Sequence, residues 1–268
     1  MNRYCRVLLT ALVLCLTPLT TTAGGPPDPA PWTALLARHV HLSGDGAATT
    51  VDYGAFARER RRLDAYLDAL SAVPREDFDG WTDDQQLAFL INAYNAYTIA
   101  LVLSGWPDIE SIKELGGFLR SPWEKRFFRL LGERRSLDDV EHGLIRGSGR
   151  YREPRIHFAV NCASVGCPAL RREAYVGRDL DRQLEDQTRR FLADDSRNRL
   201  EDATLYVSPL FKWYREDFAS GFRGADSLGA FLARYADALG LGPDGARRLA
   251  AGEMPIAFLD YDWSLNGR

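Results

Sequence analysis

The segment 87–103 limits the possible folds of this chain more than any other feature, because it is apolar on nearly every side of a helix. Thr82 and Gln85 form a capping-box pattern at its start, and Gly105 and Pro107 follow it and end the helix. A helix without a polar face belongs in the interior of a protein. The chain therefore predicts a fold built around one central, buried helix.

Shorter elements surround this helix in the sequence. Apolar periodicity and turn residues predict helices within 32–73 (the second over about 53–70), from 136 to 146 and over 180–192, and strands at 127–131, 155–160 and 205–208. Strands and helices do not alternate regularly, which favours an α+β fold. We predict a single α+β domain in which the central helix packs against a small mixed or antiparallel sheet, with a helical N-terminal flank.

The N-terminus has the pattern of a secretory signal peptide. Arg3 and Arg6 precede an apolar stretch, and small residues up to Ala23 follow it. The stretch is shorter than the roughly 20 residues of a membrane span. We expect a signal peptide at 1–23, a flexible lead-in at 24–31, a helical flank at 32–80 and the main domain at 81–266, in a periplasmic or secreted protein.

Charge narrows the range of partners. The formal net charge is −3, and loss of Arg3 and Arg6 with the signal would make it −5. A nucleic-acid partner requires a strongly basic face, so none is expected. We also expect no membrane span after signal removal, which leaves an unknown small molecule or peptide as the ligand.

Two amides lie inside the apolar helix. Asn92 and Asn95 are about one turn apart and share a face. An amide buried without a partner costs about 1–3 kcal/mol, so both side chains must form hydrogen bonds across the core. They either hold a neighbouring loop in place or orient a catalytic group.

The helix predicted from 136 to 146 carries ionisable side chains. A second capping box starts at Ser136, and Asp138, His142 and Arg146 then recur at four-residue spacing on one face, next to Glu141. This face is either a solvated stripe of charges or a means of orienting His142.

The predicted strand at 155–160 leads into the residues with the most chemistry. Arg155 and His157 would share one face of it, and a glycine-containing turn with Cys162 and Cys167 follows. A strand that ends in such a loop is a common place for a functional site. We therefore expect the chemical centre of the protein here.

Several segments, in order, resemble the family called domain of unknown function 547. They are 91–97 (INAYNAY), 136–142 (SLDDVEH), 155–162 (RIHFAVNC), 167–168 (CP), 211–214 (FKWY) and the closing 261–266 (YDWSLN). Bacterial members of that family are often exported, and plant relatives carry the domain beside a coiled-coil region. The resemblance identifies the chain as an exported bacterial member and implies no particular activity.

The histidines and cysteines allow four interpretations. Cys162 or Cys167 could be a nucleophile in acyl transfer or hydrolysis, with His157 or His142 as base. For this interpretation we favour Cys162, with Asn92 or Asn95 orienting the base. The cysteines could instead form a redox pair, or a structural disulfide worth about 2 kcal/mol in a non-catalytic binding or scaffold domain. A zinc site of His142, His157, Cys162 and Cys167 is the fourth, although no cofactor is predicted.

Two other segments are interpreted structurally. Asp260 and Asp262 lie among aromatic residues near the C-terminus and are expected to pin the chain end by hydrogen bonds. The run 211–218 mixes aromatic and charged residues and reads as an amphipathic segment that covers the core.

Overall fold

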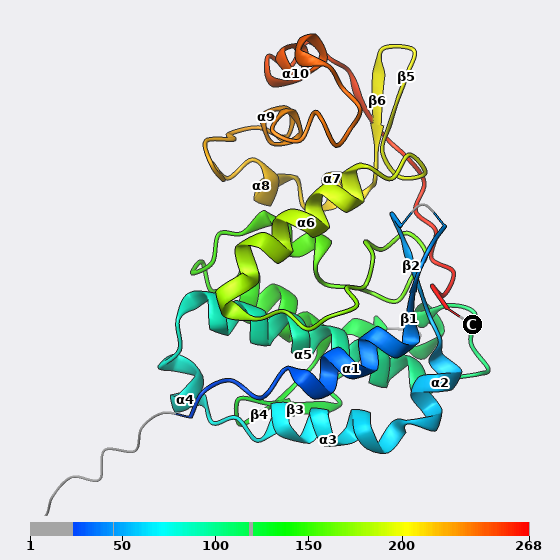
Figure 1. Ribbon diagram of the computed structural model, residues 1–268, viewed down its shortest axis with the longest axis vertical. Coiled ribbons are helices and arrows are strands. Elements are labelled where there is room, and N and C mark those ends of the chain that lie inside the picture. The colour runs from blue at the N-terminus through cyan, green and yellow to red at the C-terminus, as the bar shows by residue number, and fades with distance from the viewer. Residues whose placement is uncertain (1–23, 45, 118–119, 268) are drawn as a thin grey trace, which may run out of the picture.

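The computed structural model describes residues 24–44, 46–117 and 120–267 (Figure 1). The predicted signal peptide at 1–23 lies outside these described residues. The lead-in begins with a contact to the main body, because Trp81 Nε1 donates a hydrogen bond to the Gly24 carbonyl at 2.6 Å.

The central helix is α5, which spans Asp83–Leu103. Its capping box is formed, with Thr82 and Gln85 bonding each other's backbone N–H groups, and every residue from 86 to 102 is buried. It is the one helix of the described residues that is long and apolar enough to cross a membrane, but 94% of its most apolar window is buried inside the protein. Burial on all sides explains why this helix has no polar face.

Other helices surround α5 (Figure 1). The α-helices are α1 (Ala30–His39), α2 (Tyr53–Arg58), α3 (Arg60–Ser71), α4 (Arg75–Asp79), α6 (Leu180–Leu192), α7 (Leu210–Trp213), α8 (Arg215–Phe218), α9 (Leu228–Ala233) and α10 (Pro243–Ala250). Short 3-10 helices are η1 (Ile112–Leu115), η2 (Pro122–Glu124), η4 (Pro154–Phe158) and η5 (Gly177–Asp179), and η3 (Asp139–Arg146) is a π-helix.

The strands form three small sheets. Two are antiparallel pairs, β1 (Val40–Leu42) with β2 (Thr49–Val51) and β3 (Phe128–Leu130) with β4 (Glu133–Arg135). The third has the order β5 (Arg199–Glu201), β6 (Thr204–Val207), β7 (Ile256–Phe258), with the first pair antiparallel and the second parallel. The α+β class with a buried central helix is confirmed. The mixed sheet lies away from α5, whose neighbours include α2, α3, η3 and η5.

Two predicted elements differ from the structure. The helix predicted over 53–70 is broken at Glu59 into α2 and α3, and a hairpin, β1–β2, precedes it. The strand predicted at 155–160 is wrong, because this segment is the 3-10 helix η4. Pro154 starts η4 and the Glu153 side chain accepts from the Arg155 N–H. All residues from 154 to 161 are buried, so the alternation of polar and apolar residues does not mark an exposed and a buried face.

Apolar side chains gather in two clusters. The first surrounds α5 and takes residues from α1, α3 and η3. The second joins α6 to α9, α10 and the three-stranded sheet, which lie at the top of Figure 1. Helix η4 lies between the clusters, with Ile156 in the first and Phe158 in the second. This placement puts the segment that carries His157 and Cys162 where the two halves of the molecule meet.

Candidate functional site

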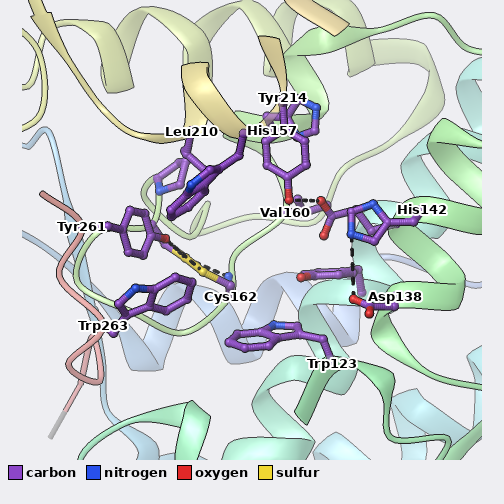
Figure 2. Close-up of a pocket in the computed structure, with 15 residues that line it drawn as sticks. Trp123, Asp138, His142, His157, Val160, Cys162, Leu210, Tyr214, Tyr261 and Trp263 are labelled. Carbon is purple, nitrogen blue, oxygen red and sulfur yellow. Dashed lines mark hydrogen bonds and ion pairs between the residues drawn. A yellow bond between two sulfur atoms is a disulfide. The ribbon is translucent and has the colours of Figure 1, made fainter. Parts of the chain in front are cut away.

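A cavity of about 190 Å³ opens where the two clusters meet (Figure 2). Its walls come from α5, η2, η3, η4, α7 and the C-terminal segment. The lining residues are six aromatic side chains (Tyr94, Trp123, Trp213, Tyr214, Tyr261, Trp263), two carboxylates (Asp138, Glu141), two histidines (His142, His157), both cysteines (Cys162, Cys167), and Val160, Pro168 and Leu210.

His157 is held by a carboxylate from another element. Its Nε2 lies 2.7 Å from Oδ2 of Asp217, on α8, and its ring stacks on Tyr214 with centroids 3.8 Å apart. The other ring nitrogen, Nδ1, is buried and has no hydrogen-bond partner among the described residues. The position of His157 is thus set by one hydrogen bond and one stacking contact.

The charges of this pair follow from burial and from its neighbours. Burial lowers the pKa of His157 although the Asp217 hydrogen bond opposes this. Burial acts to raise the pKa of Asp217, but hydrogen bonds from His157 and Arg146 outweigh it and lower that pKa well below its usual range. A neutral imidazole can donate to a carboxylate only through an N–H, so the proton lies on Nε2 and Nδ1 keeps a lone pair.

Arg146 links the two histidines. Its Nε and Nη2 donate to the two carboxylate oxygens of Asp217 at 2.6 and 3.1 Å, and its Nη1 lies 2.9 Å from Nδ1 of His142. Nε2 of His142 is 3.9 Å from Asp138. The structure therefore brings Asp138, His142 and Arg146 together along η3, with His142 between the other two.

The π-helix η3 also presents a buried carboxylate to the cavity. Glu141 is 5% exposed and accepts a hydrogen bond from the Tyr214 hydroxyl at 2.9 Å. Burial, with the Glu141 charge nearby, raises the pKa of Tyr214 and of Tyr94, so both phenols stay protonated. Within the described part of the chain, no lysine or arginine forms an ion pair with Glu141.

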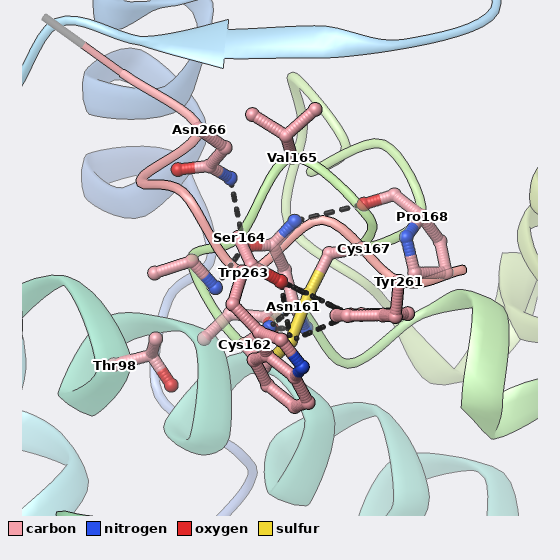
Figure 3. Close-up of a disulfide and its surroundings, with 12 residues drawn as sticks. Thr98, Asn161, Cys162, Ser164, Val165, Cys167, Pro168, Tyr261, Trp263 and Asn266 are labelled. Carbon is pink, nitrogen blue, oxygen red and sulfur yellow. Dashed lines mark hydrogen bonds between the residues drawn. A yellow bond between two sulfur atoms is a disulfide. The ribbon is translucent and has the colours of Figure 1, made fainter. Parts of the chain in front are cut away.

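The cysteines lie together at one side of the cavity (Figure 3). Their sulfurs are at bonding distance, as in a disulfide, and their Cα atoms are 6.2 Å apart. Cys162 is partly exposed and Cys167 is 3% exposed. Three potential donors surround Sγ of Cys167: the Cys162 N–H at 2.9 Å and the hydroxyls of Ser164 and Tyr261 at 3.3 Å each.

Local contacts shape this loop. The Asn161 side chain donates to the Pro168 carbonyl at 2.8 Å and accepts from the Ala163 N–H at 2.9 Å. A Cβ on Gly166 would lie 2.9 Å from the Tyr261 ring, so only glycine lets that ring approach the disulfide. The loop is thus closed by its own asparagine and covered by the C-terminal segment.

Three residues that the sequence placed at the site lie outside the cavity lining. Asn92 bonds the backbone of Tyr175 through both ends of its amide, at 2.7 and 2.9 Å. Asn95 bonds the Ala159 carbonyl and the Asn161 N–H, at 2.9 and 2.8 Å. Arg155 is 2% exposed and pairs with carboxylates of η4 and α6. These side chains hold the loops on α5 and α6, and Asp217 is the group that holds His157.

No group of three or more His, Cys, Asp or Glu side chains suited to a metal ion occurs in the described residues. The four residues of the zinc interpretation do not form such a group, and the two cysteine sulfurs are paired with each other.

Sequence reasoning missed the aromatic residues that complete the cavity from the C-terminal half, Trp213, Tyr214, Tyr261 and Trp263. It also missed Asp217, which holds His157. The segment 211–218 contributes site residues as well as core contacts. The signal was present, because 211–214 and 261–266 are among the segments that carry the family resemblance.

Comparison with known proteins gives one match. Residues 78–192 match the family model described as protein of unknown function, DUF547. No curated protein and no solved structure matches the chain. The matched segment contains η3, η4 and both cysteines, whereas α7, α8 and the C-terminal part of the cavity lie beyond it.

Proposed function

We propose a function on the premise that the chain belongs, through residues 78–192, to the DUF547 family: it is a thiol-dependent hydrolase or acyl transferase with Cys162 as nucleophile. One observation carries the proposal: Cys162 and His157 line the same small cavity, and His157 is paired with Asp217. A cavity with few convergent polar groups and perturbed pKa values is a candidate active site.

The reactive form in this proposal is the dithiol, so the disulfide must open first. A small thiol would attack the more exposed sulfur, Cys162, and Cys167 would leave as a thiolate. The Cys162 N–H, which donates to Sγ of Cys167, stabilises that negative charge. The hydroxyls of Ser164 and Tyr261 lie within 3.3 Å of both sulfurs and can donate to either. A second thiol, attacking the added sulfur, then releases Cys162 as a free thiol.

His157 is the better base of the two histidines. Its Nδ1 has a free lone pair and Asp217 can stabilise the imidazolium, whereas Nδ1 of His142 already receives a bond from Arg146. Within the described residues, neither histidine bonds a sulfur of the disulfide form, so the Cys162 side chain has to turn towards the ring after reduction. Its thiol gives the proton to Nδ1 and attacks an acyl carbon, the imidazolium protonates the leaving group, and water or another acceptor releases the acyl group.

A second candidate is a non-catalytic binding or scaffold domain with a structural disulfide. The paired sulfurs and the buried position of Cys167 favour it. In this case the cavity would bind its ligand equally well in both redox states, and reduction would lower only stability.

Thiol reactivity separates the two candidates. After reduction and removal of the reductant, we expect iodoacetamide to label Cys162 at least about tenfold faster in the native protein than in urea, because hydrogen bonds and a nearby base favour the thiolate. Mass spectrometry of peptides measures both rates. His157→Asn should bring the native rate close to that in urea.

Reaction with a generic acyl donor tests the transfer of an acyl group to Cys162. Reduced wild-type protein should be acetylated at Cys162 by p-nitrophenyl acetate, and Cys162→Ser should abolish this. Cys167→Ser is the matched control and should remain reactive. If native Cys162 is labelled no faster than in the unfolded chain and is not acetylated, the thiol mechanism is refuted. The non-catalytic binding or scaffold domain is then the remaining candidate.

We also propose a location outside the cytoplasm. The pattern at 1–23 supports export, and a disulfide fits an oxidising compartment. The intact mass of protein from the producing cell would reveal whether residues 1–23 are removed.

A further inference from the structure

One wall of the cavity is a continuous set of aromatic rings (Figure 2). Trp263 contacts Trp123 and Trp213 with centroids 5.8 Å apart in each case, and Tyr261 at 4.5 Å. Trp213 is 46% exposed, which is unusual for so large an apolar side chain. Ring faces carry partial negative charge and attract cations.

Asp138 lies next to His142 on the side of the cavity away from Tyr261 and Trp263 (Figure 2). Glu141 is the second carboxylate that lines the cavity. The nearest basic group to Asp138 is Nε2 of His142, at 3.9 Å. Glu141 is buried, and its hydrogen-bond partners in the described structure are phenol hydroxyls. A carboxylate in such surroundings carries a desolvation penalty that a nearby cation would offset.

Two cations already lie over rings of this site: Lys113 Nζ is 3.6 Å from the centroid of Trp263, and the Arg146 guanidinium carbon is 4.9 Å from that of Tyr214. The groups that line the cavity do not place a further cation beside the carboxylates. Among the described residues, no lysine or arginine lines the cavity. Arg146 forms its ion pair with Asp217, and its charge also interacts with that of Glu141. His157 lines the cavity as well and is 2% exposed, and its Nδ1 acceptor has no hydrogen-bond partner among the residues that the structure describes. The two carboxylates, the rings of Trp123 and Trp213 and this acceptor therefore favour a positively charged group that can donate hydrogen bonds.

We propose that the cavity binds a small organic ammonium ion, with its charged nitrogen beside Asp138 and Glu141 and its apolar part against Trp123, Trp213 and Trp263. The volume of about 190 Å³ is below the range of about 300–1,000 Å³ for drug-sized ligands, so the ligand is small. This inference rests on the proposed function only in taking the same cavity as the functional site.

A charge series on the disulfide form of the protein tests the proposal. The probes are benzylamine, benzyl alcohol and benzoate, which share a ring and differ in charge at neutral pH. Three of the six tryptophans line the cavity, so tryptophan fluorescence reports binding, and calorimetry gives the affinities. We expect benzylammonium to bind at least about tenfold more tightly than benzyl alcohol, and benzoate to bind least.

A pair of matched variants tests whether Asp138 causes the preference for the ammonium probe. Asp138→Asn should weaken benzylammonium binding about three- to tenfold and leave benzyl alcohol unchanged. Glu201→Gln removes an exposed carboxylate on β5, away from the cavity, and should change neither. Equal affinities for benzylamine and benzyl alcohol would overturn the proposal, as would tighter binding of benzoate than of benzylamine. Binding of D-glucose, with no preference of the cavity for benzylamine, would overturn it as well.

Failure of the ammonium-binding proposal can be told apart from failure of the proposed thiol chemistry. Both properties are measured on the wild-type protein: benzylammonium binding on the disulfide form, and the labelling and acetylation of Cys162 after reduction. Each measurement can therefore fail while the other succeeds. Ammonium binding with an unreactive Cys162 would refute only the thiol mechanism. A reactive Cys162 without preference for the ammonium probe would refute only the present inference.

Discussion

At the residue scale, Asp217 connects the groups of the site more than any other side chain. It accepts from His157 and twice from Arg146, and Arg146 in turn contacts His142. The partners come from η3 and η4, 71 and 60 residues before Asp217 in the sequence. One carboxylate therefore ties both histidines to the same framework.

Replacing Asp217 by Asn should lower the free energy of unfolding by about 1.5–3 kcal/mol at pH 7, the range for hydrogen bonds to a charged group. The pKa of Asp217 is lower in the folded than in the unfolded protein, so its stabilising effect is fully present above the unfolded pKa of about 3.9. The effect is lost as pH falls through the folded pKa. Urea unfolding of both proteins between pH 7 and pH 3 should therefore show a difference that shrinks below about pH 4.

Glu216→Gln is the control for this substitution. Glu216 is the exposed neighbour of Asp217 on α8, and its loss should change stability by less than about 0.5 kcal/mol. A difference between wild type and Asp217→Asn that stays constant down to pH 3 would contradict the assigned charge of Asp217.

The two asparagines of α5 illustrate what could be predicted for single residues. Their need for partners across the core followed from burial alone, and each bonds a backbone segment. Whether each asparagine bonds a loop or a catalytic group depends on which segment of backbone lies opposite α5. A local sequence pattern does not contain that information. Asn95 reaches the segment before Cys162 and so supports the cysteine loop from behind.

At the element scale, the π-helix η3 positions more ionisable side chains of the site than any other described element. Its widened turn ends with a hydrogen bond from the Gly147 N–H to the His142 carbonyl at 2.9 Å, five residues back. Such turns are rare and often occur at functional sites. This one carries Glu141, His142 and Arg146 to the cavity or its border.

Gly147→Ala should destabilise the protein by about 1–3 kcal/mol, because the new Cβ would lie 2.5 Å from the His142 carbonyl oxygen. Gly143→Ala is the matched control in the same helix, since a Cβ there meets nothing within 4 Å. It should be neutral or stabilising by up to about 1 kcal/mol. Urea denaturation measures both, and equal effects of the two substitutions would argue against the tight closure at Gly147.

Elements with strong local signals were predicted well. The helix predicted over 180–192 is α6 (Leu180–Leu192), and strands predicted at 127–131 and 205–208 correspond to β3 and β6 within about one residue. The error at 155–160 has a physical cause: a segment buried on every side carries no periodic contrast between core and solvent. The sequence pattern of η4 was therefore ambiguous.

At the scale of the whole molecule, the cavity needs both hydrophobic clusters. Tyr94 and Val160 belong to the first, Leu210 to the second, and Tyr214 and Tyr261 pack against the second. The family match ends at residue 192, before α7 and α8. The first cluster also depends on α1 and α3, which precede the matched segment.

A fragment of residues 78–192 should therefore not fold by itself. It would expose the face of α5 that α2 and α3 cover and would lack Asp217 and Tyr214. We expect no cooperative urea transition for this fragment by circular dichroism, and a single cooperative one for residues 24–267. A cooperative transition of the short fragment would show that the matched segment is an independent domain.

The sequence alone determined the central helix, its cap, the α+β class and the concentration of histidines and cysteines near 142–167, because these depend on neighbours within a few turns of the chain. Only the tertiary structure decided that Asp217, Tyr214 and Tyr261 meet His157 and Cys162. Their partners lie 57 to 99 residues away. Contacts of that span are set by how two hydrophobic clusters pack against each other, and no local pattern records that arrangement.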